Sequence, residues 1–222
     1  MISVAIDGPA GAGKSTIARR VAQKLGYLYV DTGALYRAIG LYAHRQGMDP
    51  SDPQQVCPLL PQIQLKLHYV DGVQHISLNG EDVSRDIRLP EMSNAASQVS
   101  AIPQVREFLF DLQQNLAKEN NVVMDGRDIG TVVLPKAQVK IFLTATPEER
   151  ARRRHLELME KGMEQNYEQV LQDVLQRDYN DSHRAIAPLK QAPDAVRIDT
   201  TDLDFEQSVQ AVYEHILSKQ GR

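Results

Sequence analysis

A lysine and two hydroxyl residues, Lys14, Ser15 and Thr16, follow a run of small residues that begins at Gly8. Residues 8–15 fit the pattern G-x-x-x-x-G-K-[ST] and lie between an apolar segment and an amphipathic one. Glycines let successive backbone N–H groups converge on one anion, the lysine can reach the β- and γ-phosphates, and the Ser15 hydroxyl is a ligand for Mg²⁺. A glycine-rich turn that matches the pattern by chance is the alternative. We expect a nucleoside triphosphate to be bound here by Gly8, Pro9, Ala10, Gly11, Ala12, Gly13, Lys14, Ser15 and Thr16.

A carboxylate, Asp125, ends the apolar segment 121–125 and is followed by Gly126, Arg127 and Asp128. Ligands of open α/β sheets bind at the carboxyl ends of the strands, so Asp125 is placed to orient water bound to Mg²⁺. Arg127 and Asp128 add a guanidinium fork and a hydrogen-bond acceptor. A strand-end Asp-Gly turn with incidental charges is the alternative interpretation.

Three arginines, Arg150, Arg153 and Arg154, are spaced i, i+3, i+4 and share one face of a predicted helix. Like charges on one face repel each other unless an anion neutralises them, which favours a lid that closes on phosphates. Two glutamates precede these arginines, so an ordinary solvated helix face is the alternative.

Another helical stripe changes from apolar to charged along its length. Val170 and Val174 are followed, at helical steps, by Arg177, Asp181 and Arg184. A stripe that becomes charged without changing face is leaving a core and lining a cleft. A frayed, exposed helix end is the alternative.

Arg37 follows Asp31 and Thr32, two residues that can cap a helix. It lies off the apolar stripe of its helix and on the same rim as the glycine-rich loop, although a solvated helix arginine would look the same in sequence. Arginines from four segments are thus predicted to meet Lys14 at one rim. Because guanidinium groups match phosphate oxygens and one triphosphate does not need so many, we expect phosphoryl transfer between two nucleotides.

These residues need a scaffold, and short apolar segments alternate with amphipathic helices as in a parallel sheet covered on both faces. The predicted strands are residues 2–7, 27–31, 121–125, 139–143 and 195–199, and the last helix begins after Asp204. An antiparallel hairpin over residues 65–78, with its turn at Asp71-Gly72, interrupts this alternation. The pattern predicts one α/β domain with a five-stranded parallel sheet.

The composition excludes several classes of protein. A net charge of −4 and an aromatic content of 5% argue against nucleic-acid binding. The single cysteine, Cys57, allows no internal disulfide and is expected to be a small buried residue in a reducing compartment. The six histidines show no metal-ligand spacing, so surface or packing roles are expected. We see no secretory signal and no membrane span, and expect a cytoplasmic protein without a membrane partner.

Six segments together resemble bacterial cytidylate kinases, which are nucleoside monophosphate kinases. They are "DGPAGAGKST", "DTGALYR", "NAASQVSAIPQVRE", "DGRDIGTVV", "KIFLTATPEERARRR" and "RDYNDSHRAIAPLKQAPDA", and they cover nearly the whole chain in the family's order. The glycine-rich loop is generic, whereas the fourth and sixth segments are specific. The resemblance implies a P-loop kinase fold whose hairpin insert enlarges the monophosphate-binding region.

The resemblance also implies roles by matched position. The acceptor CMP or dCMP would be bound by Asp31, Thr32, Arg37, Ser97, Arg106, Arg127, Asp128, Arg177, Asp181 and Arg184. Within this set Arg37, Arg127 and Arg184 would hold the phosphate. Ser97, Arg106 and Asp128 would read the cytosine edge, and Arg177 and Asp181 would contact the sugar. The catalytic residues expected are Lys14, Arg127, Arg150, Arg153 and Arg154, with Mg²⁺ bound directly by Ser15 and through water by Asp125.

The resulting hypothesis is transfer of the γ-phosphoryl group of ATP to CMP or dCMP by a monomer. The expected core comprises residues 1–31, 121–149 and 187–222, with a monophosphate-binding region at about 32–120 and a lid at about 150–163. The same chemistry on UMP, AMP or a small metabolite is the first alternative. A GTPase switch is disfavoured because no Asn-Lys-x-Asp segment occurs.

Overall fold

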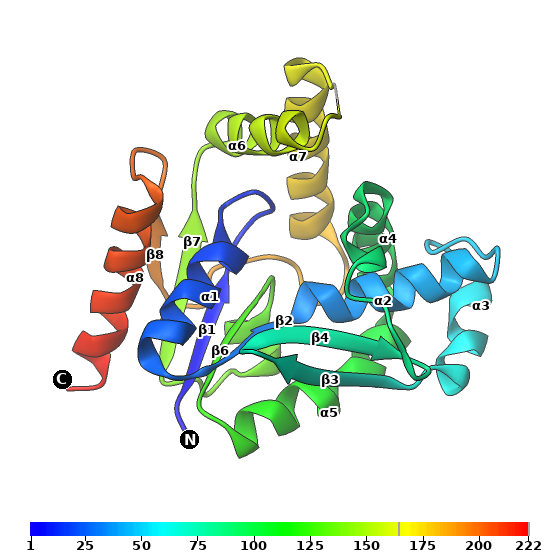
Figure 1. The fold of residues 1–222 in the computed structure, drawn as a ribbon, viewed down its shortest axis with the longest axis horizontal. Coiled ribbons are helices and arrows are strands. Elements are labelled where there is room, and N and C mark those ends of the chain that lie inside the picture. Colours follow the sequence, from blue (N-terminus) through cyan, green and yellow to red (C-terminus); the bar gives the residue numbers. More distant parts are fainter. Residues whose placement is uncertain (164, 222) are drawn as a thin grey trace.

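The structure, a computed structural model, describes residues 1–163 and 165–221. Its centre is a five-stranded parallel sheet in the order β2-β6-β1-β7-β8 (Figure 1). The strands are β1 (Ser3–Asp7), β2 (Leu28–Asp31), β6 (Val122–Gly126), β7 (Val139–Thr144) and β8 (Val196–Asp199). The predicted five-stranded parallel sheet is therefore confirmed, and each predicted strand overlaps an observed one.

The side chains of β1 alternate between the two faces of this sheet. Val4 and Ile6 point to one face, where they pack with α1 (Lys14–Leu25) and α8 (Phe205–Lys219). Ala5 points to the other face, which is covered by α5 (Pro103–Glu119) and by the π-helical turn that follows β6. Apolar contacts on both faces explain why the strands read as short continuous apolar runs.

The region between β2 and β6 has an apolar core of its own. Its helices are α2 (Thr32–Arg45), α3 (Pro53–Val56) and α4 (Pro90–Ser100), which pack with α5 and with one face of a three-stranded antiparallel sheet. The strands of that sheet are β3 (Leu65–Val70), β4 (Val73–Leu78) and β5 (Glu81–Asp82). Cys57, expected to be a small buried residue, packs against this core but is only partly buried.

The turn of the predicted hairpin is confirmed in its details. Asp71 and Gly72 both have positive φ angles, 51° and 76°, as a two-residue hairpin turn of the primed type requires. The hairpin also contacts the parallel sheet. The Gln74 side chain accepts the Asp31 N–H at 2.9 Å, and the Tyr69 hydroxyl donates to the Tyr29 carbonyl at 2.9 Å.

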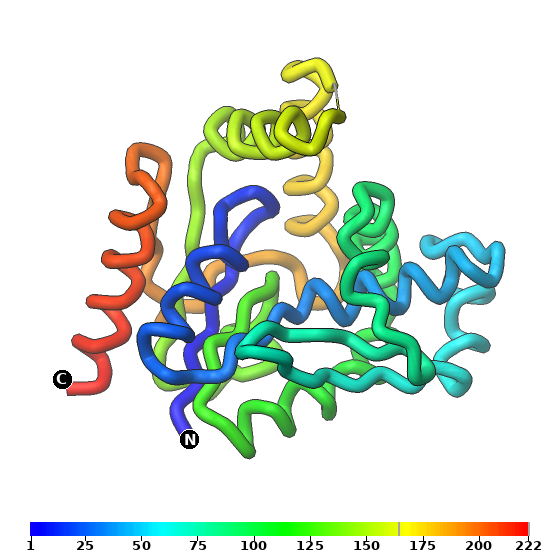
Figure 2. The backbone as a smooth tube through the Cα atoms, viewed as in Figure 1, coloured from blue at the N-terminus to red at the C-terminus, as the bar shows by residue number. Residues whose placement is uncertain are grey.

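Two further helices, α6 (Pro147–Glu160) and α7 (Tyr167–His183), lie beyond the carboxyl edge of the parallel sheet (Figure 1). They pack on each other through Ala151, Leu158, Val170 and Val174. The loop that follows β1 rises towards α6 in Figure 2, and the backbone of Gly11 lies against Arg150. No helix among the described residues is long and apolar enough to cross a membrane.

Candidate active site

The glycine-rich loop joins β1 to α1, as predicted. A Cβ atom on Gly8 would lie 1.9 Å from the carbonyl oxygen of Leu143, so only glycine lets the loop pass β7 at this point. Gly13, with a φ of 80°, is the N-cap of α1. A left-handed residue at this position turns the loop into the helix, and the N–H groups of the first helical turn are left to bind an anion.

Lys14 is buried beneath this loop, and its Nζ donates a hydrogen bond to the Pro9 carbonyl at 2.7 Å. Burial, and then the nearby Arg127 guanidinium, lower the pKa of Lys14 well below its ordinary value. Both effects act against the charged amine. An anion beside Lys14 would favour the charged form of the amine.

Asp125, at the carboxyl end of β6, lies next to the start of α1. Its Oδ2 accepts from the Ser15 hydroxyl at 2.9 Å and its Oδ1 from the Tyr29 hydroxyl at 2.8 Å. Burial, followed by the neighbouring Asp31, raises the pKa of Asp125 to about 6, although Lys14 acts in the opposite direction. A hydroxyl beside a carboxylate is an all-oxygen donor set, the kind that Mg²⁺ prefers. Tyr29 was not predicted as a site residue, because its apolar neighbours in the sequence give no sign of this hydrogen bond.

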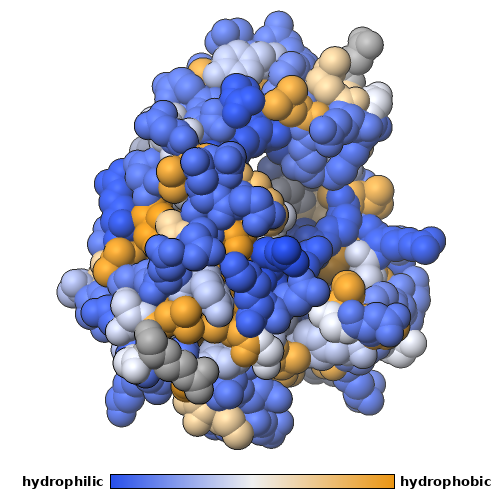
Figure 3. All heavy atoms as spheres, turned by 60° about the vertical axis from the view of Figure 1, so that its left-hand side comes forward, coloured by the Kyte–Doolittle hydropathy of each residue, from blue (hydrophilic) through white to orange (hydrophobic). Residues whose placement is uncertain are grey.

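The loop forms one wall of a cavity of about 650 Å³ at the carboxyl edge of the sheet. In Figure 3 the surface is hollowed beneath its uppermost part, and hydrophilic side chains border the hollow. The cavity is lined by these predicted site residues: Ala10, Gly11, Gly13, Lys14, Ser15, Thr16, Asp31, Thr32, Arg37, Ser97, Arg106, Asp125, Arg127, Asp128, Arg153, Arg154, Arg177, Asp181 and Arg184. Gly8, Pro9, Ala12 and Arg150 were also predicted and do not line it.

Asp31 organises one wall of the cavity. Its carboxylate caps α2 by accepting the Ala34 N–H at 3.0 Å, as the sequence predicts. The same carboxylate accepts from Arg37 at 2.8 Å and from Arg88 at 3.0 Å. Nε of Arg37 is buried without a hydrogen-bond partner among the described residues. Arg88 was not predicted because it belongs to a short 3-10 turn with no helical or strand periodicity.

Two arginines from distant segments, Arg127 and Arg177, line the cavity close enough to repel each other. Nε of Arg127 donates to Asp181 at 2.7 Å, which joins the turn after β6 to α7. Arg177 hydrogen-bonds to Ser93, but its Nε is buried without a partner among the described residues. Burial, and then repulsion by Arg127, lower the pKa of Arg177 to about 10. This half-satisfied guanidinium is suited to an anionic ligand.

A buried ion pair between Arg106 and Asp128 lies at the end of the cavity formed by α4 and α5. Arg184 approaches the other oxygen of Asp128 at 3.5 Å and donates to Ser100 at 3.2 Å. Ser97 lines the same end from α4. The charged continuation of the α7 stripe therefore enters the cavity, as the helical spacing predicts.

The arginines of α6 divide into two groups, contrary to the expectation of one shared cavity-facing surface. Arg150 is buried, where it donates to Asp178 at 2.9 Å and to the Ala10 carbonyl at 3.0 Å. It braces the glycine-rich loop against α7 and does not face the cavity. Arg153 and Arg154 do line the cavity, and Arg152, which was not predicted, lines it beside them.

The start of α8 supplies a part of the cavity that sequence analysis did not assign. Leu203, Asp204, Phe205 and Ser208 line it, and Phe205 is 43% exposed. Asp204 also forms a capping box with Gln207, which explains it as a helix start. No local pattern marks these residues, because only the tertiary fold brings α8 next to the glycine-rich loop.

Comparisons with known proteins agree with this geometry. The family model described as cytidylate kinase matches residues 4–219. The cytidylate kinase of Caldicellulosiruptor bescii is 52% identical over 96% of this chain and 94% of its own length, and that of Lactobacillus johnsonii is 48% identical over 99% and 96%. A solved structure of an uncharacterized protein from Eubacterium ventriosum shares the fold with a TM-score of 0.53 and 12% identity, covering 98% of this chain and 99% of that one. The resemblance stated from the sequence is confirmed: the chain belongs to the cytidylate kinase family.

Proposed function

We propose that this protein transfers the γ-phosphoryl group of ATP to CMP and dCMP, giving ADP and CDP or dCDP. Family membership supports the reaction class. The observation that carries the proposal is the convergence of guanidinium groups from α2, α5, the turn after β6, and α6 and α7 on one cavity beside the glycine-rich loop. Two of these groups, those of Arg37 and Arg177, have a buried Nε without a partner among the described residues. Acceptor oxygens of a bound nucleotide would satisfy both.

ATP is the proposed donor, with its phosphates on the N–H groups of residues 8–16 and beside Lys14. The neighbouring Ser15 hydroxyl and Asp125 carboxylate fit Mg²⁺, with Ser15 as the direct ligand and Asp125 acting through water. When bound, the ion would neutralise charge on the β- and γ-phosphates. Arg153 and Arg154, which line the same cavity, would stabilise the transferring group electrostatically.

The acceptor is proposed to lie towards α2, α4 and α5. Arg37, Arg127 and Arg184 would hold its phosphate, while Thr32 and Asp31 shape the wall behind them. Because an ionised phosphate is already a nucleophile, catalysis requires positioning and charge stabilisation without a general base.

The pair formed by Arg106 and Asp128 is proposed to read cytosine together with Ser97. A carboxylate accepts a hydrogen bond from the exocyclic amine of cytosine, and uracil has no donor at that position. Buried polar groups left unpaired by the wrong base make such a site selective. Arg177 and Asp181 would contact the sugar.

We also propose that α6 closes over both nucleotides and excludes water. The predicted lid, residues 150–163, covers only part of α6 and the turn after it. Because α6 packs on α7 through an apolar cluster, the moving unit would include the first turns of α7 as well. The boundaries of this lid, the monomeric state and the cytoplasmic location stay predictions.

The test is a coupled ADP-release assay with ATP, Mg²⁺ and each of CMP, dCMP, UMP, AMP and GMP. CMP and dCMP should be the preferred acceptors, and Arg127→Ala should lower kcat/KM for CMP by a factor of about 10²–10³. Arg20→Ala, which removes an exposed arginine of α1, is the matched control and should leave activity unchanged. Equal activity of Arg127→Ala and the parent enzyme would contradict the proposal. Preferred use of another monophosphate would favour the first alternative, and GTP binding without acceptor-dependent ADP release would favour a GTPase.

A further inference from the structure

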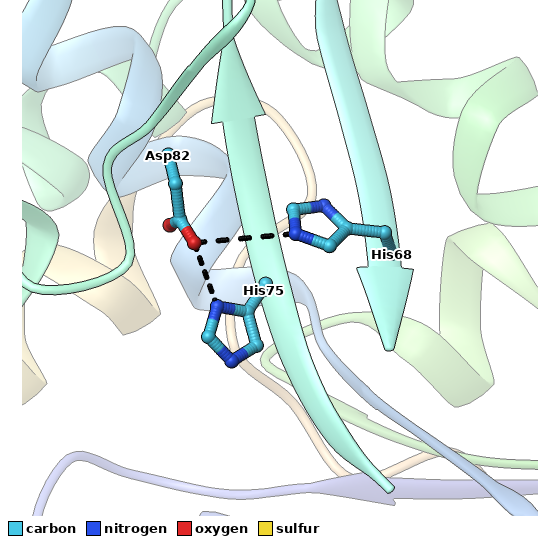
Figure 4. Close-up of side chains that lie close together, drawn as sticks. All are labelled: His68, His75 and Asp82. Carbon is cyan, nitrogen blue, oxygen red and sulfur yellow. Dashed lines mark hydrogen bonds and ion pairs between the residues drawn. The ribbon is translucent and has the colours of Figure 1, made fainter. Parts of the chain in front are cut away.

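Two histidines and an aspartate come together on the hairpin sheet, away from the nucleotide cavity. His68 of β3 pairs directly with His75 of β4, and Asp82 of β5 pairs with Ser77 of β4. Side chains two residues apart on a strand share a face, so the pairing of Ser77 places Asp82 on the face that carries His75. Figure 4 shows the two rings and the carboxylate directed towards one another.

The distances between the polar atoms are short. Nδ1 of His75 lies 2.8 Å from Oδ2 of Asp82, and Nε2 of His68 lies 4.0 Å from the same oxygen. One potential ligand atom from each residue lies within 4.8 Å of the other two. The ring centroids of His68 and His75 are 5.3 Å apart. Two imidazole nitrogens and one carboxylate oxygen, all possible metal ligands, thus lie around one point near the surface.

The carboxylate of Asp82 is held in place by its other oxygen. Oδ1 accepts the backbone N–H of Ser84 at 2.9 Å and also the Ser84 hydroxyl, which leaves Oδ2 facing the histidines. These two bonds from Ser84 fix the orientation of the carboxylate. Outer hydrogen bonds of this kind orient the ligands in metal sites of proteins.

We propose that His68, His75 and Asp82 form a binding site for Zn²⁺, with water as the fourth ligand. Zn–N bonds of about 2.0–2.1 Å and Zn–O bonds of about 2.0–2.2 Å place tetrahedral ligands about 3.3 Å apart. The His75–Asp82 pair would therefore open by about 0.5 Å and the His68–Asp82 pair would close by about 0.7 Å, measured from the distances above. His68 and Asp82 are exposed and His75 is partly exposed, so small side-chain rotations suffice.

The donor set also separates this site from the nucleotide cavity. Imidazole nitrogens suit Zn²⁺, whereas Mg²⁺ prefers oxygen ligands such as Ser15 and Asp125. The two ions would not compete for one position, so Zn²⁺ binding at the hairpin can be measured without nucleotide.

The ion would join β3, β4 and β5. Tyr69 and Gln74, the residues next to His68 and His75 along the strands, hydrogen-bond to the backbone of β2. A ligand that binds only the folded protein stabilises it in proportion to its occupancy. Zn²⁺ is therefore expected to raise the Tm of the wild-type protein.

The experiment uses the full chain, stripped with EDTA and kept free of nucleotide and Mg²⁺. Zn²⁺ is titrated by calorimetry, and Co²⁺ is used as a spectroscopic probe of coordination. One equivalent of Zn²⁺ should bind, and Co²⁺ should give the intense visible absorption of a four-coordinate ion. Zn²⁺ binding should be weakened by at least about tenfold in each of the variants His68→Gln, His75→Gln and Asp82→Asn. Changing a residue that only hydrogen-bonds to a metal ligand already lowers metal affinity by about this factor, and these variants remove a ligand itself. His215→Gln in α8 is the matched control and should bind like the wild type.

Two readouts separate loss of a ligand from loss of the fold. Far-UV circular dichroism and the Tm in EDTA should be the same for the wild type and the three site variants, while Zn²⁺ should raise the Tm of the wild type only. Failure of the wild type to bind one equivalent, a six-coordinate Co²⁺ spectrum, or equal Zn²⁺ affinity of the wild type and the three variants would each overturn the proposal. None of these readouts depends on kinase activity, so they are independent of the proposed reaction.

Discussion

The carboxylate of Asp7, at the end of β1, holds the backbone that follows Asp128. Its two oxygens accept the N–H groups of Ile129 and Gly130, each at 2.7 Å. The residue is 4% exposed, and burial raises the pKa of Asp7 to about 6, although the two hydrogen bonds act in the opposite direction. At neutral pH Asp7 is ionised, and its burial makes the free energy of unfolding lower than it would be with a protonated Asp7. The same carboxylate fixes the turn that carries Arg127.

The perturbation that isolates this effect is Asp7→Asn. Burial raises the pKa of Asp7 from its ordinary 3.8 to about 6, so between these pH values the folded state binds more protons than the unfolded one. A group whose folded pKa is raised in this way makes the protein more stable as the pH falls. Integrated from about pH 7 to about pH 5, the difference amounts to about 1 kcal/mol. When the pH is lowered over this range, the free energy of unfolding of the wild type should rise by this amount relative to that of Asp7→Asn, because asparagine does not titrate.

The assay is urea unfolding of both proteins at several pH values, because the difference between them cancels the titration of all other groups. Asp49→Asn is a useful control, because Ser51 lowers the pKa of exposed Asp49 from 3.8. Its stability difference from the wild type should therefore stay nearly constant between about pH 7 and about pH 5. A stability difference between the wild type and Asp7→Asn that does not change with pH, or that grows towards neutral pH, would refute the reasoning. Asp7→Asn should also raise KM for CMP, because an amide cannot accept both N–H groups through two oxygens.

Two further predictions concern the loop and the base. Gly8→Ala places a methyl group against the Leu143 carbonyl and should lower the free energy of unfolding by about 3 kcal/mol or more. Gly47 also has a positive φ but has open space around it, so Gly47→Ala should lower the free energy of unfolding by only about 1–2 kcal/mol. Equal losses for the two variants in urea unfolding would contradict the close approach of Gly8 to Leu143. Asp128→Asn should reduce kcat/KM for CMP about tenfold or more relative to UMP, because the carboxylate acceptor for the cytosine amine is lost, and an unchanged CMP-to-UMP ratio in steady-state assays would count against that role.

The fold was predictable where the sequence carries local signals. Buried strands read as apolar runs, and the hairpin showed both alternation and an Asp-Gly turn. The strand β5 was missed because it has two exposed residues and no periodicity. The cluster of His68, His75 and Asp82 was missed because its members meet only through strand register, so the assignment of every histidine to a surface or packing role took no account of cross-strand pairing.

The site was predictable where a helix maintains one face. The stripe that begins at Val170 extends into the cavity at Arg177 and Asp181 because helical steps preserve direction along a straight helix. The same rule failed for α6. Arg150 packs against α7 and pairs with Asp178, and Arg152 lines the cavity. Spacing tells which residues share a side of a helix, but tertiary packing decides which side faces the ligand.

The charge balance of the cavity explains how so many arginines coexist. Among the described residues, nine cationic and seven acidic side chains line it. Arg127 is paired with Asp181 and Arg106 with Asp128, so their burial is compensated by acids of the same cavity. A phosphate that binds to one of these paired arginines replaces a carboxylate as its anionic partner. It does not neutralise an unpaired charge. Arg177 differs, because its Nε has no hydrogen-bond partner in residues 1–163 and 165–221, and its pKa is lowered by burial and by Arg127. An acceptor phosphate held by Arg127 would also stabilise the nearby Arg177, which we propose to contact the sugar.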